Sequence, residues 1–386
     1  MSHAEAATSS WRATVGGIEV LGGSEVVAFL GEEASRLGGQ RALVVSDRGV
    51  SAAGHSERVL WALTGSGLKA ELFDEVPENP TTVAVAQGAA AAAAFGADLL
   101  VAVGGGSALD CAKGINFLVS NGGKMEDYWG WAKAARPMLP SIGIPTTAGT
   151  GSEAQSYALI TQAQAPPGDA HGRKMACGDP KARFRLVLLD PQLALTAPAP
   201  VRAAAGIDAV AHAVESFVTR RRNPVSSLLA REAWNRLSGQ FALAVSPRPS
   251  AAGLAEMLFG AHLAGAAIEA SMLGAAHAAA NPLTARYGIA HGQAVGLMLP
   301  TVVRWNAQGP AGELYRELSL GGAEEIALAV AQMLRTAGLP ERLSALDVRA
   351  EELPELAGRA RQEWTGGFNP RPVSEEDFLR LYEAAF

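Results

Sequence analysis

Short apolar runs alternate with helical patterns along the first half of the chain. An alanine-rich helical pattern, roughly Val83–Phe95, separates the first two of these runs. Continuous apolar strands between helices are buried on both faces, which indicates a mostly parallel α/β sheet. Each run ends near a glycine, a proline or an aspartate, and the predicted strands are Arg41–Ser46, Leu99–Val103, Ser141–Ile144 and Arg185–Leu189.

The pattern changes after Pro198 and Pro200, and no convincing strand follows Val201. Long stretches rich in alanine, leucine, glutamate and arginine replace the strands, and the fourth of them stops at a Gly-Leu-Pro sequence typical of a helix end. We therefore predict an α/β domain over residues 1–200 and an all-helical domain over 201–386. The predicted helices are Asp208–Thr219, Val225–Leu243, Leu254–Ile268, Glu324–Ala337 and Glu375–Ala385.

Composition narrows the class of protein. The 386 residues suffice for two packed units, and an apolar fraction of 48% with 18% charged residues fits an ordinary globular enzyme. A net charge of −6 gives no electrostatic case for binding nucleic acid or an anionic membrane. The N-terminus lacks a signal-peptide layout, no membrane span is expected, and the two cysteines show no pairing pattern. We expect a soluble, cytoplasmic protein.

A glycine-rich loop follows the second buried strand. Gly105, Gly106 and Ser107 lie between that strand and a predicted helix, Ala108–Ile115. Glycines let a phosphate approach the backbone, and free N–H groups at a helix N-terminus favour an anion. The alternative is a tight strand-to-helix turn without a ligand, with Asp110 and Lys113 as solvated charges.

A second loop, Pro145–Glu153, follows the third strand and offers several hydroxyl groups and two glycines. These groups suit ribose and phosphate oxygens, although a hydroxyl-rich surface turn would look the same. Asp47 ends the first strand, where a carboxylate accepts the ribose hydroxyls of NAD and repels the 2′-phosphate of NADP. The pattern favours NAD, and a plain turn aspartate before Gly49 is the alternative.

Four residues of the helical half form a candidate metal site. Asp208 and His212 are four residues apart, which places both side chains on one face of a helix. His277 lies on a later apolar helix, and His291 follows it. One carboxylate and three imidazoles suit Fe²⁺ or Zn²⁺ with one position left open, whereas any single histidine here would more often be a buried, hydrogen-bonded residue.

The ordered motifs resemble those of the iron-containing (group III) alcohol dehydrogenase family over nearly the whole chain. Gly104–Lys113 is similar to the family's GGGSxxDxxK, Pro145–Glu153 to PTTxGTGSE, and Asp208–Glu215 to DAxxHAxE. His277 and the Gly-x-x-His segment that ends at His291 follow in the expected order. This set is far more specific than any single motif.

The resemblance implies a Rossmann-like N-terminal domain and a helical C-terminal domain, the fold shared with dehydroquinate synthase, with the active site in the cleft between them. It implies a metal-dependent, NAD-linked alcohol dehydrogenase or aldehyde reductase that forms homodimers or larger assemblies. The implied metal ligands are Asp208, His212, His277 and His291. The implied NAD contacts are Asp47 and Asn79 at the adenosine, Gly105, Gly106 and Ser107 at the pyrophosphate with Asp110 close by, Thr146, Thr147, Thr150 and Ser152 along the rest, and Lys174 at the nicotinamide ribose.

One position departs from the family. Members commonly carry a second histidine four residues after the third metal ligand, where it helps to move the alcohol proton, and this chain has Asn281 there. The i,i+4 spacing from His277 predicts that Asn281 points into the site. An amide does not titrate near neutral pH, so water or another group, such as His171 or Tyr287, would relay the proton.

Three rival activities share the fold. A glycerol dehydrogenase would need a more polar pocket than Leu273–Ala280 offers, and maleylacetate reductases typically lack the full metal set. A dehydroquinate synthase-type lyase would need several basic residues, and the region of the predicted ligands is poor in lysine and arginine. The identity of the small alcohol or aldehyde substrate is not readable from the sequence.

Overall fold

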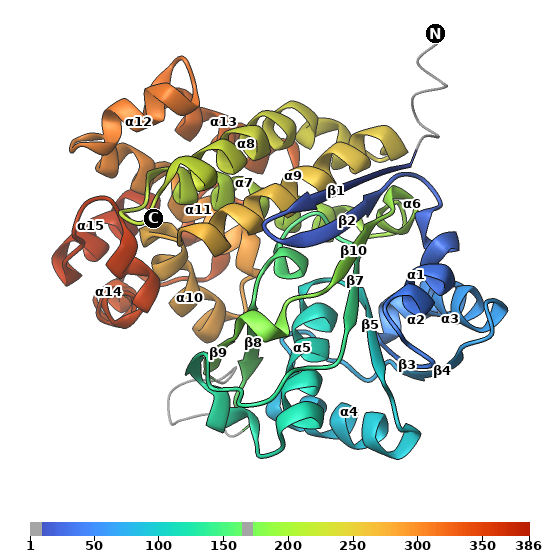
Figure 1. Ribbon diagram of the computed structural model, residues 1–386. Coiled ribbons are helices and arrows are strands. Elements are labelled where there is room, and N and C mark those ends of the chain that lie inside the picture. Colours follow the sequence, from blue (N-terminus) through green and yellow to red (C-terminus); the bar gives the residue numbers. More distant parts are fainter. Residues whose placement is uncertain (1–9, 164–172) are drawn as a thin grey trace, which may run out of the picture. The chain divides into compact units, whose positions relative to one another are not determined.

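The computed structural model describes residues 10–163 and 173–386, and these form two compact units (Figure 1). The first unit comprises residues 10–147, 152–163 and 173–197, and the second comprises 148–151 and 198–386. The division falls beside the proline-rich stretch at which the sequence pattern changes. The short segment 148–151 is the exception, because it belongs to the helical unit although strands flank it in the sequence.

A seven-stranded sheet forms the centre of the first unit, with the order β1-β2-β10-β7-β5-β3-β4. Its strands are parallel except for the antiparallel pair β1–β2, so the predicted parallel α/β architecture is confirmed. The strands are β1 (Trp11–Val15), β2 (Ile18–Gly22), β3 (Arg41–Val45), β4 (Lys69–Phe73), β5 (Leu99–Gly104), β7 (Ser141–Pro145) and β10 (Leu186–Leu189).

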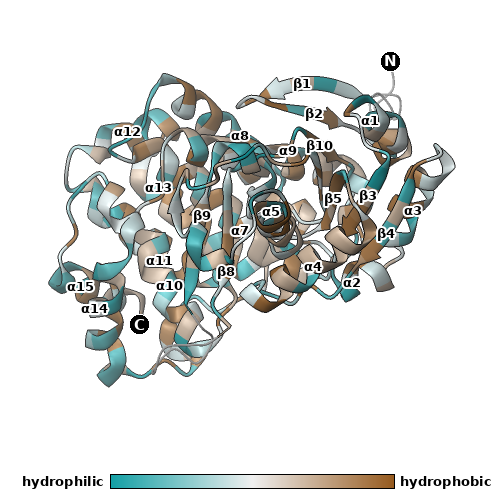
Figure 2. Ribbon diagram, turned by 60° about the horizontal axis from the view of Figure 1, so that its bottom comes forward, coloured by the Kyte–Doolittle hydropathy of each residue, from teal (hydrophilic) through white to brown (hydrophobic). Residues whose placement is uncertain are grey.

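Helices cover both faces of the central strands (Figure 1). Side chains at alternate positions of these strands, such as Val44 and Val101, form a buried cluster with Leu30 of α1 and Leu63 of α3. The helices α4 and α5 pack on the strands from the other side, and Figure 2 shows β5 as an apolar strand. The helices are α1 (Leu30–Arg36), α2 (Arg48–Ala52), α3 (His55–Gly65), α4 (Thr82–Phe95), α5 (Gly106–Asn121) and α6 (Pro191–Ala194).

Edge strands are the part of this unit that the apolar pattern does not predict. The strand β1 is exposed at four of its five positions, and β4, at the opposite edge, is also largely exposed. Neither carries a continuous apolar run, because an edge strand needs no burial on both faces. A small second sheet with the order β6-β9-β8 was also not predicted; its strands are β6 (Gly130–Trp131), β8 (Tyr157–Thr161) and β9 (Lys174–Gly178).

Within the described residues of the second unit, all regular elements are helices, as predicted. Its helix α9 is long and apolar enough to cross a membrane by composition, but 72% of that window is buried among the other helices, as in the core of a globular unit. The helices are α7 (Ala199–Val218), α8 (Pro224–Ala244), α9 (Ala251–Ala270), α10 (Ala275–Tyr287), α11 (His291–Ala307), α12 (Ala311–Leu318), α13 (Gly322–Thr336), α14 (Leu353–Gln362) and α15 (Glu375–Ala385).

Candidate metal centre and nucleotide-binding loops

Helix α7 supplies three buried polar side chains from one face. Asp208, His212 and Glu215 occupy positions i, i+4 and i+7, which recur on the same side of an α-helix. The Nε2 atom of His212 lies 3.4 Å from Oδ1 of Asp208. Asp208 and His212 therefore lie on one face of the helix, as their spacing predicted.

Helix α10 brings His277 to the same place. This helix begins just after Gly274, and His277 is its third residue. The imidazole of His277 stacks on that of His212 with ring centroids 4.8 Å apart and an interplanar angle of 18°. Its Nε2 atom lies 3.4 Å from Oδ1 of Asp208.

Helix α11 begins at His291, whose Nε2 atom lies 3.9 Å from Oδ1 of Asp208. The next residue, Gly292, makes this approach possible. A Cβ atom on Gly292 would lie 1.9 Å from the carbonyl oxygen of Ala204 on α7, a distance that real Cβ atoms do not show. Only glycine therefore lets the first turn of α11 rest on the backbone of α7 beside Asp208.

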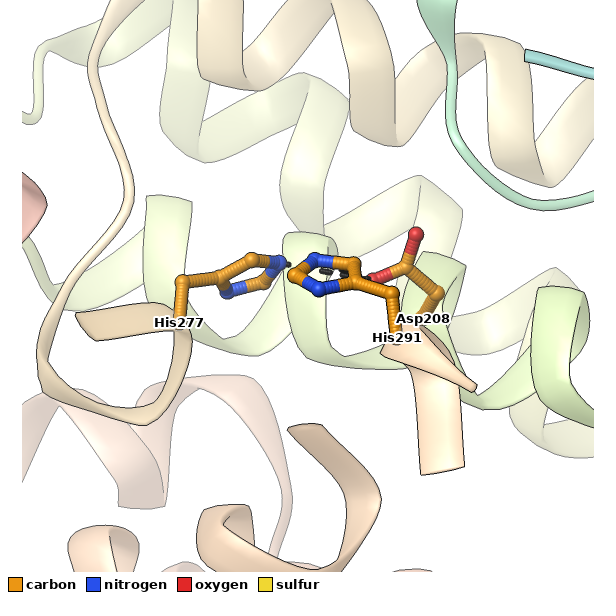
Figure 3. A group of neighbouring side chains, drawn as sticks. All are labelled: Asp208, His277 and His291. Atoms are coloured by element: carbon orange, nitrogen blue, oxygen red, sulfur yellow. Dashed lines mark ion pairs between the residues drawn. The ribbon is translucent and has the colours of Figure 1, made fainter. Parts of the chain in front are cut away.

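Three of the four predicted metal ligands form one compact group (Figure 3). One ligand atom from each of Asp208, His277 and His291 lies within 4.8 Å of the others, and the figure shows the two rings and the carboxylate directed at a common region. His212 lies outside this group of three, although it contacts Asp208 and stacks on His277. The group comes from three different helices, which explains why its members are so far apart in the sequence.

The group has an electrostatic character suited to a cation. Burial favours the neutral form of Asp208, but the surrounding imidazoles outweigh it and hold the pKa of this carboxyl below its usual value. Burial lowers the pKa of His212 to about 4. For His277 burial acts in the same direction, yet the carboxylates of Asp208 and Glu215 prevail and raise its pKa to about 9.

The donor atoms themselves fit a divalent ion. Asp208 Oδ1 and His277 Nε2 are buried and find no hydrogen-bond partner among the described residues. Buried polar atoms in native proteins are nearly always satisfied, so an unsatisfied pair at one point calls for an explanation such as an ion. A carboxylate oxygen and imidazole nitrogens are the ligands that Fe²⁺ and Zn²⁺ accept.

Glu215 was quoted in the sequence motif without a role. Its Oε2 atom lies 2.6 Å from Nδ1 of His277. The spacing of seven residues from Asp208 places it on the ligand-bearing face of α7, and that spacing is the signal by which the sequence could have indicated it.

The first glycine loop forms the N-terminus of α5, as its sequence predicts. Gly105 is the N-cap residue and Gly106 the first helical residue. Gly104 has a φ of +151°, and a Cβ atom there would lie 2.7 Å from that of Ala108. The free backbone N–H groups at this helix N-terminus favour an anion.

Two other predicted cofactor residues lie beside this turn. The backbone N–H of Asn79 donates to Oγ of Ser107 at 3.1 Å, and Asn79 has a φ of +55°. Asp47 caps α2, since its Oδ1 atom accepts from the N–H of Val50 at 2.9 Å, and its Oδ2 atom lies 3.3 Å from the Cβ position of Gly104. The structure therefore brings Asp47, Asn79 and Ser107 together around one helix N-terminus.

Asp110 and Lys113 are not the solvated charges that the alternative interpretation supposed. They form a buried ion pair with Nζ 3.2 Å from Oδ1, and the Lys113 ammonium also donates to the carbonyl of Tyr157 at 2.5 Å. The second carboxylate oxygen of Asp110 accepts from the N–H of Leu159 at 3.1 Å. The pair thus joins α5 to β8, because a buried charge needs a partner that a surface charge does not.

The second loop is divided between the two units. Thr146 and Thr147 belong to the first unit, where the N–H of Thr146 donates to the carbonyl of Gly104 at 2.9 Å and Thr147 Oγ1 lies 3.4 Å from the Cβ position of Gly105. Ser152 begins a short 3-10 helix in the same unit, and Lys174 is exposed at the start of β9. Thr150 belongs to the helical unit.

The two glycines of this loop have a packing role. A Cβ atom on Gly149 would lie 2.7 Å from Cα of Ala205 on α7, and one on Gly151 would lie 2.6 Å from Cα of Gly265 on α9. Both helices belong to the same unit as the segment 148–151. The glycines therefore let the segment lie directly on two helix backbones, a constraint that the sequence motif alone does not reveal.

Asn281 stands where the resemblance placed a proton-relay histidine, and its side-chain amide donates to Oε2 of Glu363 at 2.8 Å. Glu363 was not singled out from the sequence. Of the two relay candidates, Tyr287 donates its hydroxyl to Glu352, and burial together with this carboxylate raises its pKa to about 12. A hydroxyl held in this way is a poor relay near neutral pH, and the other candidate, His171, lies outside the described residues.

Known proteins match the chain over both units. The family described as "Iron-containing alcohol dehydrogenase" matches residues 18–191, and "Fe-containing alcohol dehydrogenase family, C-terminal" matches residues 202–386. Lactaldehyde reductase of Escherichia coli (strain K12) is 33% identical over 379 residues, covering 94% of this chain and 97% of that protein. The 4-hydroxybutyrate dehydrogenase of Cupriavidus necator is 33% identical over 373 residues, covering 92% and 95%.

Solved structures agree with this match. The crystal structure of a 1,3-propanediol oxidoreductase has a TM-score of 0.90 at 28% identity, covering 98% of this chain and 100% of that chain. An alcohol dehydrogenase from Oenococcus oeni has a TM-score of 0.90 at 26% identity with the same coverage. The predicted family and the predicted reaction class, oxidoreduction of an alcohol and aldehyde pair, are confirmed. The chain belongs to the iron-containing alcohol dehydrogenase family.

Proposed function

We propose that this protein interconverts a small alcohol and its aldehyde with NAD(H) and one divalent metal ion held by Asp208, His212, His277 and His291. The observation that carries the proposal is the group of the buried Asp208 and His277 with the half-buried His291, whose donor atoms lie within 4.8 Å of one another. An ion at such a site acts as a Lewis acid toward an alcohol or carbonyl oxygen. Fe²⁺ and Zn²⁺ both suit the donor set.

The roles of the protein's own residues follow from their chemistry. Asp208 supplies the negative charge, and its lowered pKa keeps it ionised at neutral pH. His277 is held by a carboxylate at Nδ1, which leaves Nε2 as the atom that faces Asp208. Asn281 holds a substrate or water by hydrogen bonding, with the carboxylate of Glu363 at its amide.

For the cofactor, we propose the N-terminus of α5, with Gly105, Gly106 and Ser107, as the pyrophosphate site. Asp47 and Asn79 beside it are assigned to the adenosine, and the carboxylate of Asp47 favours NAD over NADP. NAD supplies the hydride step. We propose that the rest of the cofactor contacts Thr146, Thr147, Thr150, Ser152 and Lys174. The buried Asp110 supports α5 through its hydrogen bond with the N–H of Leu159.

The substrate class is proposed from the relatives. Their names specify lactaldehyde, 1,3-propanediol and 4-hydroxybutyrate, short molecules that carry a second oxygen-bearing group. We propose the same class here, in a cytoplasmic homodimer or larger homo-oligomer.

The test is NADH formation on purified protein with a panel of short alcohols and diols, before and after chelation and re-addition of Fe²⁺ or Zn²⁺. Activity that is lost with the metal and restored by it supports the proposal. His277→Ala is expected to lose both the bound metal and the activity. Stoichiometric metal in that variant would contradict the ligand assignment, and product formation without net NADH change would indicate a lyase.

A further inference from the structure

The carboxylate of Glu215 makes several contacts at the start of α10. It is buried on α7 and accepts three hydrogen bonds from the start of α10. Oε2 lies 2.6 Å from Nδ1 of His277 and accepts from the N–H of Gly274 at 3.1 Å. Oε1 accepts from the N–H of Ala276 at 2.7 Å.

These contacts replace the missing cap of α10. The N-cap residue of this helix is Gly274, which has no side chain to satisfy the free N–H groups of the first turn. Glu215 accepts two of these N–H groups, and Oδ1 of Asn369 accepts the third, from Ala275, at 3.2 Å. A Cβ atom on Gly274 would lie 2.9 Å from Glu215 and 3.0 Å from Asn369, so the glycine makes room for both caps.

The same carboxylate fixes the ring of His277. With Nδ1–H donated to Glu215, the neutral imidazole has its lone pair on Nε2, the atom that lies 3.4 Å from Asp208 Oδ1 and finds no hydrogen-bond partner among the described residues. Histidines that bind metals commonly donate their other nitrogen to a carboxylate, which fixes the tautomer and the ring orientation.

We propose that Glu215 is a positioning residue that sets the tautomer and orientation of His277 for metal binding by tying both to the N-terminus of α10. This inference rests on the proposed metal site. Asn369 serves as the matched control within the same turn, because it caps the helix through Ala275 without a contact to His277 in the described interactions.

Glu215→Gln removes the carboxylate with little change in size. A glutamine has one acceptor oxygen for three donors, so it cannot serve both His277 and the turn. If the amide nitrogen faces Nδ1, the imidazole must protonate Nε2 and lose its lone pair. If the oxygen faces Nδ1, the N–H of Ala276 faces the amide nitrogen, which is also a donor. The turn that carries His277 then loses a hydrogen bond.

The experiment compares wild type, Glu215→Gln and Asn369→Ala by competition of Zn²⁺ with a chelating dye and by thermal unfolding of the metal-free proteins. We expect Glu215→Gln to weaken zinc binding by about 10–100-fold. Asn369→Ala should keep its zinc affinity within about threefold even where its metal-free form unfolds earlier, as loss of a cap predicts. Equal affinity in Glu215→Gln and wild type, or an equal loss in both variants, would overturn the inference.

A second readout does not depend on a Glu215 variant. In zinc-loaded wild-type protein the ring ¹⁵N shifts of His277, assigned against His277→Ala, should show a protonated Nδ1 and a metal-bound Nε2. The opposite tautomer would overturn the positioning role. Wild-type protein that takes up no metal would instead refute the proposed function, and the inference with it.

Discussion

Replacing Gly292 by alanine tests whether the approach of α11 to α7 builds the proposed metal site. The new Cβ atom would start 1.9 Å from the carbonyl oxygen of Ala204. An ordinary carbon–oxygen contact is about 3.3 Å, so the first turn of α11 must move by roughly 1.4 Å. The neighbouring atom belongs to the backbone of a buried helix and cannot rotate away.

Such a movement matters because His291 is the first residue of α11. Metal–ligand distances hold within about 0.2 Å, so a shift of this size takes His291 out of the ligand set. Overpacking of this kind costs about 1–3 kcal/mol in the free energy of unfolding. We therefore expect Gly292→Ala to lose stability and to bind metal much more weakly.

Gly239→Ala is the matched control. Gly239 lies on an exposed position of α8, and nothing lies within 4 Å of its Cβ position. The same substitution there should raise the free energy of unfolding by about 0.5–1 kcal/mol, because alanine favours a helix over glycine. Urea unfolding of the metal-free proteins and chelator competition measure both effects. Gly292→Ala with wild-type stability and zinc affinity would refute the packing argument.

Three further predictions concern ionisable side chains. Because the pKa of His277 is raised to about 9, its Nε2 is protonated near pH 7.5 without metal, and metal uptake should release about one proton there and none well above the raised pKa. Calorimetry in buffers of different ionisation enthalpy measures this release, and zero protons near pH 7.5 would contradict it. Asn281→His would place an imidazole beside Glu363, and the carboxylate charge should raise the pKa of that imidazole above about 6.5. The pH profile of alcohol oxidation should then gain a step at the raised pKa. An unchanged profile would mean that residue 281 lies off the proton path. Both cysteine thiols are buried with pKa values raised to about 12 by burial, so neither should react with a thiol reagent at pH 8 until the protein unfolds.

Much of the fold was readable because it depends on local pattern. Continuous apolar runs located the central strands, and the alanine-rich and leucine-rich stretches located helices such as α4, α9 and α15 within a few residues. The spacing of Asp208 and His212 predicted their contact, since a helix repeats every 3.6 residues. The family followed from the order of short motifs, and their order is a property of the sequence alone.

The tertiary structure decided what no local period encodes. Glu215 meets His277 across 62 residues, and Asn369 caps the same turn from 94 residues away. Such contacts depend on which helices pack together and how closely, and at Gly292 the closeness is set by a missing Cβ atom. The sequence by itself determined the central strands, many of the helices and the family. Only the packing of three helices decided which atoms converge and which carboxylate contacts His277, because side chains on different helices share no periodic relation until the helices meet.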